Sequence, residues 1–156
     1  MQPLQRKEIP LYVKSFIDPE AAGTAVRKGQ LLDPMVPCFI VKKNQVLISL
    51  STLDFSFVVE ENVSHIFQLF HEYQMKVDLI QNSAISFTVC LDNKFDNLPA
   101  LVAKLKATFS VSYHENVSLY TIRHYTKEAI KNLEKGKTIL CKQTTANTYQ
   151  IVVKEA

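Results

Sequence analysis

Hydrophobic residues follow two different spacings in the middle of the chain. Val63, Ile66, Phe67 and Phe70 recur at i, i+3, i+4 and i+7, which predicts an amphipathic helix over residues 63–73. Hydrophobic and polar residues then alternate over residues 85–91, which is typical of a strand with one buried face. Shorter hydrophobic runs predict strands over 46–51 and 77–81.

A second helix completes this unit. Asn97 is a candidate N-cap, and Pro99 is tolerated in the first helical turn. The hydrophobic residues expected on one face of this helix are Leu98, Leu101, Val102, Leu105 and Phe109. Val111 and Tyr113 continue as a strand, so the order is βαββαβ. This order predicts the ferredoxin-like fold, in which two helices cover one face of an antiparallel sheet.

The pattern then repeats in part. Strands are expected over 117–123, 138–142 and 148–154, with a helix over 127–135 between the first two. Thr126 is a candidate N-cap of that helix, and Gly136 is suited to end it. This second unit lacks a helix and a strand, which the N-terminal segment around Leu11, Val13 and Phe16 is expected to supply.

The predicted fold class is therefore α+β, with two ferredoxin-like domains, the first inserted into a discontinuous second. Residues 38–116 form the first domain. Residues 1–37 and 117–156 together form the second, and 27–37 serve as the linker between them.

Composition excludes several functions. The 156 residues carry a net charge of only +3, too little to indicate nucleic-acid or membrane binding, and no hydrophobic run is long enough to span a bilayer. With no signal peptide, a cytoplasmic location is expected. Cys38, Cys90 and Cys141 are interpreted as buried thiols, and no metal-ligand spacing occurs. Three glycines cannot form a phosphate cradle, and no catalytic residues are predicted.

One polar cluster is a candidate ligand site. Asp78 lies within a hydrophobic run and suits an ammonium group, whereas the helix N–H groups near Asn62 and Val63 suit a carboxylate. The hydroxyl of Ser83 is able to join either network. A free amino acid presents both charges. The alternative is that Asp78 is a solvated edge residue and Ser83 only forms a turn.

These segments resemble the regulatory ACT domains of aspartate kinases. The resemblance covers nearly the whole chain in the right order. It rests on Ile66-Phe67, Val77-Asp78-Leu79-Ile80-Gln81-Asn82-Ser83, Ile9-Pro10-Leu11-Tyr12-Val13, Asp18-Pro19-Glu20-Ala21-Ala22-Gly23-Thr24, Ser118-Leu119-Tyr120-Thr121-Ile122-Arg123 and Thr148-Tyr149-Gln150-Ile151-Val152-Val153.

The resemblance implies a regulatory amino-acid-binding and dimerisation region, giving feedback inhibition of aspartate kinase. The implied effector is lysine, or else threonine, held at a homodimer interface. ATP and Mg²⁺ would bind only in a kinase domain, which this sequence does not match, so no catalysis is expected of the chain itself. The implied effector residues are Ser51, Thr52, Asn62, Val63, Val77, Asp78, Asn82 and Ser83.

One departure from the family supports an alternative. Lysine-sensitive members usually have Gly-Phe-Leu at the start of the first helix, where this chain has Glu61-Asn62-Val63. Glu61 repels a ligand carboxylate unless its side chain points away. A dimerisation module that ignores amino acids is therefore the second hypothesis. Phe55 and Phe57, in the preceding loop, are expected to be exposed, or else to cover the ligand site or pack at the partner interface. RNA binding is disfavoured, since no RNA-binding signature is visible.

Overall fold

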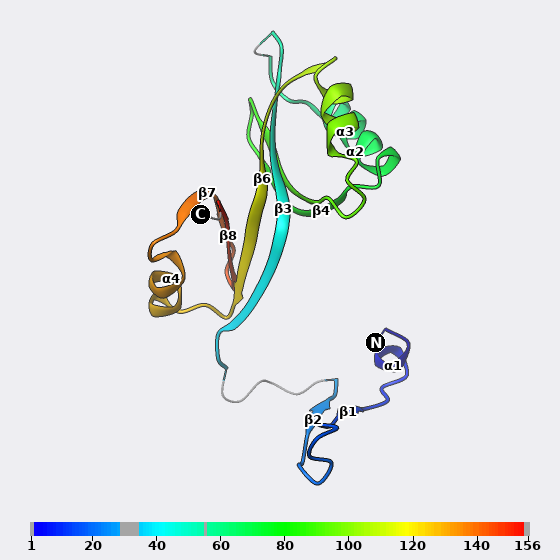
Figure 1. Ribbon diagram of the computed structural model, residues 1–156, viewed down its shortest axis with the longest axis vertical. Coiled ribbons are helices and arrows are strands. Elements are labelled where there is room, and N and C mark those ends of the chain that lie inside the picture. The colour runs from blue at the N-terminus through cyan, green and yellow to red at the C-terminus, as the bar shows by residue number, and fades with distance from the viewer. Residues whose placement is uncertain (1, 29–34, 55, 155–156) are drawn as a thin grey trace. The chain divides into compact units, whose positions relative to one another are not determined.

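The computed structural model describes residues 2–28, 35–54 and 56–154 (Figure 1). The chain divides into two compact units, Met1–Val36 and Pro37–Ala156. Phe55 and part of the expected linker lie outside the described residues.

The N-terminal unit is small. It contains helix α1 (Gln2–Arg6) and strands β1 (Leu11–Val13) and β2 (Thr24–Val26), which pair antiparallel with each other. Gly23 precedes β2 with a φ of +70°, and a Cβ there would lie 2.4 Å from the Val13 carbonyl oxygen. Glycine is required for this close approach. The sequence interpretation found β1 but missed α1 and β2, which are very short.

The larger unit is built on one six-stranded antiparallel sheet with the order β4-β5-β3-β6-β8-β7. Its elements are β3 (Cys38–Thr52), α2 (Glu60–Glu72), β4 (Lys76–Asn82), β5 (Phe87–Asp92), α3 (Leu98–Leu105), β6 (Phe109–Arg123), α4 (Lys127–Glu134), β7 (Thr138–Thr144) and β8 (Thr148–Lys154). In Figure 1, α2 and α3 lie on one side of β3 and β6, and α4 lies on the other.

Each end of this sheet has the ferredoxin-like strand order, so the predicted fold class is confirmed. We call β4, β5, α2, α3 and the adjoining parts of β3 and β6 the first half. We call β7, β8, α4 and the remaining parts of β3 and β6 the second half. The two long strands β3 and β6 run through both halves, and each is 15 residues long.

In the second half, the strand beside β6 is the start of β3, where Lys42 pairs with Leu119 and Phe39 pairs with Ile122. The sequence interpretation gave this position to the segment around Leu11 and Val13. In the structure those residues pair with β2 instead. That the two ends of the chain make up one domain stays a prediction.

Three hydrophobic clusters hold the larger unit together. The first lies between α2, α3 and the sheet, and includes Phe70, Phe87 and Leu101. Another lies under α4, with Leu133 and Ile151 among its members. The remaining cluster joins the two sheet faces that carry no helix, and we call it the shared core. It contains Leu47, Leu79, Cys90, Val117, Leu119, Cys141 and Val152.

Helix ends follow the sequence in one case and depart from it in another. The Thr126 hydroxyl accepts a hydrogen bond from the Ala129 N–H at 3.1 Å, and Gly136 has a φ of +72°, so both predictions for α4 are confirmed. Asn97 does not cap α3 through its side chain. Its side-chain amide instead donates to the Tyr73 carbonyl at 2.9 Å, which ties the start of α3 to the end of α2.

Candidate functional site

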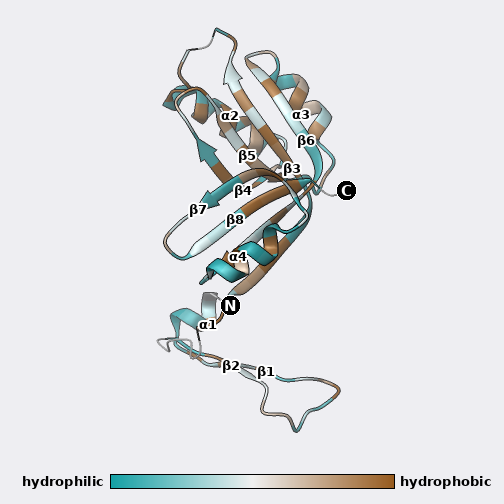
Figure 2. Cartoon of the chain, turned by 90° about the vertical axis from the view of Figure 1, so that its left-hand side faces the viewer, coloured by the Kyte–Doolittle hydropathy of each residue, from teal (hydrophilic) through white to brown (hydrophobic). Residues whose placement is uncertain are grey.

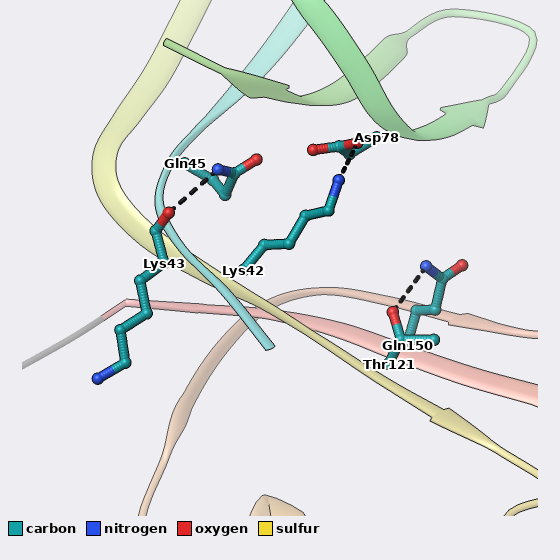
Figure 3. Close-up of polar contacts among 6 residues, drawn as sticks. All are labelled: Lys42, Lys43, Gln45, Asp78, Thr121 and Gln150. Atoms are coloured by element: carbon teal, nitrogen blue, oxygen red, sulfur yellow. Dashed lines mark hydrogen bonds and ion pairs between the residues drawn. The ribbon is translucent and has the colours of Figure 1, made fainter. Parts of the chain in front are cut away.

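Asp78 lies on the face of the first half that carries no helix. A bulge between Val77 and Leu79 interrupts the pairing of β4 with β5 at this residue. The Asp78 carboxylate accepts a hydrogen bond from the Lys42 ammonium at 2.5 Å, and only 7% of the Asp78 side chain is exposed (Figure 3). Asp78 is thus a buried partner of an ion pair, and its interpretation as a solvated edge residue is wrong.

The turn after β4 lies beside the start of α2, as the sequence predicted. The Val58 N–H donates to the Ala84 carbonyl at 2.9 Å, which joins the segment before α2 to the β4–β5 turn. Ser83 caps that turn: its hydroxyl accepts from the Ser86 N–H at 3.1 Å. Asn82 and Ser83 are exposed. The turn is therefore accessible, and Ser83 already has a structural role in it.

Helix α2 begins at Glu60, three residues before the predicted start. The Val63 N–H consequently donates to the Val59 carbonyl, and the Asn62 side chain accepts from the Val59 N–H. The N–H of Val63 is therefore occupied within the helix and is not available to a ligand carboxylate. Glu60 and Glu61 stand in the first turn, where negative charge stabilises the helix dipole.

The remaining predicted residues divide between two places. Ser51 and Thr52 end β3, and the buried Thr52 hydroxyl donates to the Ser56 carbonyl. They lie at the same end of the sheet as the β4–β5 turn, because Leu50 pairs with Phe87 and Phe87 pairs with Asn82. Val77 packs against the core beneath α2.

Asp78 and Ser83 do not converge on one point within this chain. They are five residue steps apart along the chain, a distance of about 16 Å at the usual rise per residue of a strand. A free amino acid is much shorter than this. One copy of the chain thus places the predicted ammonium partner and the predicted turn hydroxyl too far apart for a shared ligand.

A shallow groove of about 490 Å³ runs along β4 and includes Asp78. Phe67 from α2 forms one side, and Gln143 and Gln150 from β7 and β8 form the other. The β4 residues that line it are Val77, Asp78, Leu79 and Ile80. The groove combines hydrophobic walls, one carboxylate and two amides, a set that fits a small ligand with an aliphatic part and a positive charge.

The shared core next to the groove contains two cysteines. The Cys141 thiol donates to the side-chain oxygen of Gln81 at 2.9 Å, across the two faces. Burial raises the pKa of Cys90 to about 12, with further contributions from the charges of Asp78 and Cys141. Burial also raises the pKa of Cys141 above its ordinary value. Cys90 and Cys141 are buried as predicted, whereas Cys38 is exposed and its prediction is wrong.

Sequence reasoning missed Lys42, Gln143 and Gln150. None of them belongs to a motif, and Lys42 lies 36 residues before Asp78. The signal available was the unexplained carboxylate in a hydrophobic run, which required a cationic partner somewhere in the chain. The described residues contain no group of three or more His, Cys, Asp or Glu side chains placed to hold a metal ion. Within the same residues, no helix is long and hydrophobic enough to cross a membrane.

Comparison with known proteins identifies the kind of domain. No family model matches the chain. A regulatory domain of aspartate kinase from Porphyromonas gingivalis W83, described as putative and C-terminal, has a TM-score of 0.61 at 22% identity, over 76% of this chain and 86% of that one. The larger unit thus shares its ferredoxin-like fold with that domain.

The relatives in sequence are aspartokinases. Lysine-sensitive aspartokinase 3 of Escherichia coli is 28% identical over 131 residues, and chloroplastic aspartokinase 1 of Arabidopsis thaliana is 23% identical over 141 residues. These matches cover 77% and 90% of this chain but 28% and 22% of the relatives. The Escherichia coli aspartokinase III structure with lysine and aspartate has a TM-score of 0.71 at 25% identity, over 97% of this chain and 37% of that one. The resemblance inferred from the sequence is confirmed.

Proposed function

We propose that this chain is the allosteric regulatory region of an aspartate kinase, and that it binds a free amino acid, lysine in the first instance. The observation that carries the proposal is the groove along β4, which contains Asp78 within the stretch that resembles the family's effector site. The similarity to aspartokinases, one of them crystallised with lysine, supports it.

In a dimer, Asp78 of one copy would lie close to Ser83 of the other copy. β4 is the end strand of the sheet, so its outer edge is available to pair with another chain. Two β4 strands that pair antiparallel about a twofold axis at Ile80 bring Asp78 of one copy opposite Asn82 of the other. Residues 77 and 83 then also face each other. The ligand in this arrangement is held by two copies, with its ammonium at Asp78 and its other end at the opposing turn.

Regulation would follow from a population shift. An amino acid that binds one arrangement of the two copies more tightly stabilises that arrangement, and an attached kinase domain reports the difference as inhibition. Aspartate phosphorylation would belong to that domain of the whole protein. The groove lies on the edge of the first half and touches both halves of the sheet. A ligand there would therefore act on the larger unit as a whole.

The test is thermal unfolding of the purified chain with millimolar lysine, threonine or methionine. Binding to the folded state raises the melting temperature. We expect lysine to raise it, and Asp78→Asn to abolish the increase. Asp96→Asn, the same substitution at an exposed residue between β5 and α3, is the matched control. If none of the three amino acids shifts the melting temperature, the ligand-insensitive dimerisation module is the better description.

A further inference from the structure

The ion pair between Lys42 and Asp78 joins the two halves of the sheet. Lys42 pairs with Leu119, whose side chain belongs to the shared core, so the two side chains project from the same face of the second half. Asp78 projects from the helix-free face of the first half. Figure 3 shows the Lys42 ammonium reaching the Asp78 carboxylate, while the side chain of Lys43 points away from it. Lys42 therefore occupies the carboxylate where a ligand ammonium is proposed to bind.

This polar site has more acceptors than Lys42 satisfies. Within the described residues, the second carboxylate oxygen of Asp78 and the side-chain oxygen of Gln45 are buried and have no hydrogen-bond partner. Gln45 is 4% exposed, and its amide nitrogen is already used, because it donates to the Lys43 carbonyl at 3.1 Å. Figure 3 shows the Gln45 oxygen turned toward Asp78. Buried acceptors without donors are costly, so the site is suited to a group that brings further N–H bonds.

We propose that Lys42 competes with the side-chain ammonium of the effector for the Asp78 carboxylate. An effector with a primary ammonium on an aliphatic chain displaces Lys42 from Asp78 and takes its place. This inference rests on the proposed function. The incoming ammonium has three N–H donors, enough for both oxygens of Asp78 and the oxygen of Gln45. Lys42 is the residue that sets affinity and selects for a charged side chain.

The two partners differ in how easily they move. The Lys42 side chain is 41% exposed, and its ammonium regains water when it leaves. Asp78 is fixed in the bulge of β4 and stays in place. The exchange breaks a direct link between β3 of the second half and β4 of the first half. Effector binding is thereby coupled to the junction between the two halves.

Two substitutions of Lys42 are expected to act in opposite directions. Lys42→Met removes the competing ammonium, and we expect lysine to bind at least five-fold more tightly. Lys42→Arg holds the carboxylate through two parallel hydrogen bonds, so lysine should bind more weakly than to the unaltered chain. Lys43→Met removes the same charge from the neighbouring exposed residue and should leave the affinity unchanged.

The measurement is titration calorimetry of the full 156-residue chain with lysine, and with norleucine as a probe of the same length without the side-chain ammonium. Norleucine affinity should not respond to Lys42→Met. If lysine binds the unaltered chain but both Lys42 variants bind it equally well, Lys42 has only a structural role and this inference is overturned. If neither the unaltered chain nor Lys42→Met binds lysine, the proposed function itself fails and the inference fails with it. Binding by Lys42→Met alone would support the competition directly.

Discussion

The two halves of the larger unit follow the same strand order but are completed differently. The first half places two helices, α2 and α3, over its sheet and buries Phe70, Phe87 and Leu101 beneath them. The second half has α4 alone. The start of β3 in that half leaves Phe39 and Val41 exposed, at 54% and 45%.

The first half is held together mainly by hydrophobic packing, whereas the second half is held together partly by polar contacts near its surface. In Figure 2, the end of β7 and much of α4 are hydrophilic. Helix α4 is joined to the adjacent strands by polar contacts as well: Glu134 accepts hydrogen bonds from Tyr149 and from Lys142. The first half is therefore expected to be the more stable part, and the shared core is what carries that stability into the second half.

The largest expected contrast is in cysteine reactivity. Alkylation requires the thiolate, and burial raises the pKa of Cys90 to about 12. Cys38 is exposed at the start of β3. We expect iodoacetamide at pH 8 to modify Cys38 at least about 100-fold faster than Cys90 or Cys141, as followed by peptide mass spectrometry. All three should react alike in denaturant. Rapid modification of Cys141 in the folded chain would show that the shared core opens readily.

Core truncations should separate the two halves in stability. Leu101 is 0% exposed beneath α3, and Leu101→Ala should lower the free energy of unfolding by about 4 kcal/mol. Leu133 is 8% exposed beneath α4, and Leu133→Ala should lower it by about 2 kcal/mol. Denaturant unfolding measures both values. Equal losses would mean that the second half is packed as tightly as the first, against the comparison above.

The N-cap of α4 predicts a smaller effect. Thr126→Ala removes the side-chain acceptor for the Ala129 N–H and should lower the free energy of unfolding by about 1 kcal/mol. Thr126→Ser retains the hydroxyl and should restore most of that loss. Thermal unfolding of the three chains is the measurement. If Thr126→Ser is as unstable as Thr126→Ala, the loss comes from the methyl group and not from the cap.

Local signals predicted the elements of both halves, but not the lengths of β3 and β6. A strand was predicted only over residues 46–51, and the polar run Lys42-Lys43-Asn44-Gln45 interrupts the alternation just before it. The structure continues β3 through the run with register shifts at Lys42/Gln45 and Gln45/Leu47. Asn44 and Asn116 have φ values of 56° and 53°, in the left-handed region that asparagine tolerates. Irregular backbone of this kind has no periodicity to detect.

One part of the site was predicted from the sequence and another was missed, because the two parts depend on different kinds of contact. The contact between the start of α2 and the β4–β5 turn follows from the fold order, and it was predicted. The partner of Asp78 depends on which sheet faces meet, since Lys42 reaches it from the opposite half. Periodicity assigns a residue to a face of its own element but does not identify the face that packs against it. Substituting Asp78 should therefore cost stability as well as ligand binding, because Lys42 would lose its partner.

The smallest expected effect is a pH dependence confined to the second half. Hydrogen bonds from Lys142 and Tyr149 lower the pKa of Glu134 from its ordinary value of 4.5. A carboxyl with a lowered pKa stabilises the fold above its unfolded-state pKa, and this contribution is lost as the pH falls through the folded-state value. Glu134→Gln should therefore reduce the loss of stability between neutral pH and acid pH, whereas Glu115→Gln, at an exposed position of β6, should not. Urea unfolding at pH 7 and below pH 4 compares the three chains. Because both side chains of the pair are partly exposed, the change should be small and should shrink further in high salt. A salt-independent effect would indicate instead that Glu134 acts through its contact with the buried Tyr149.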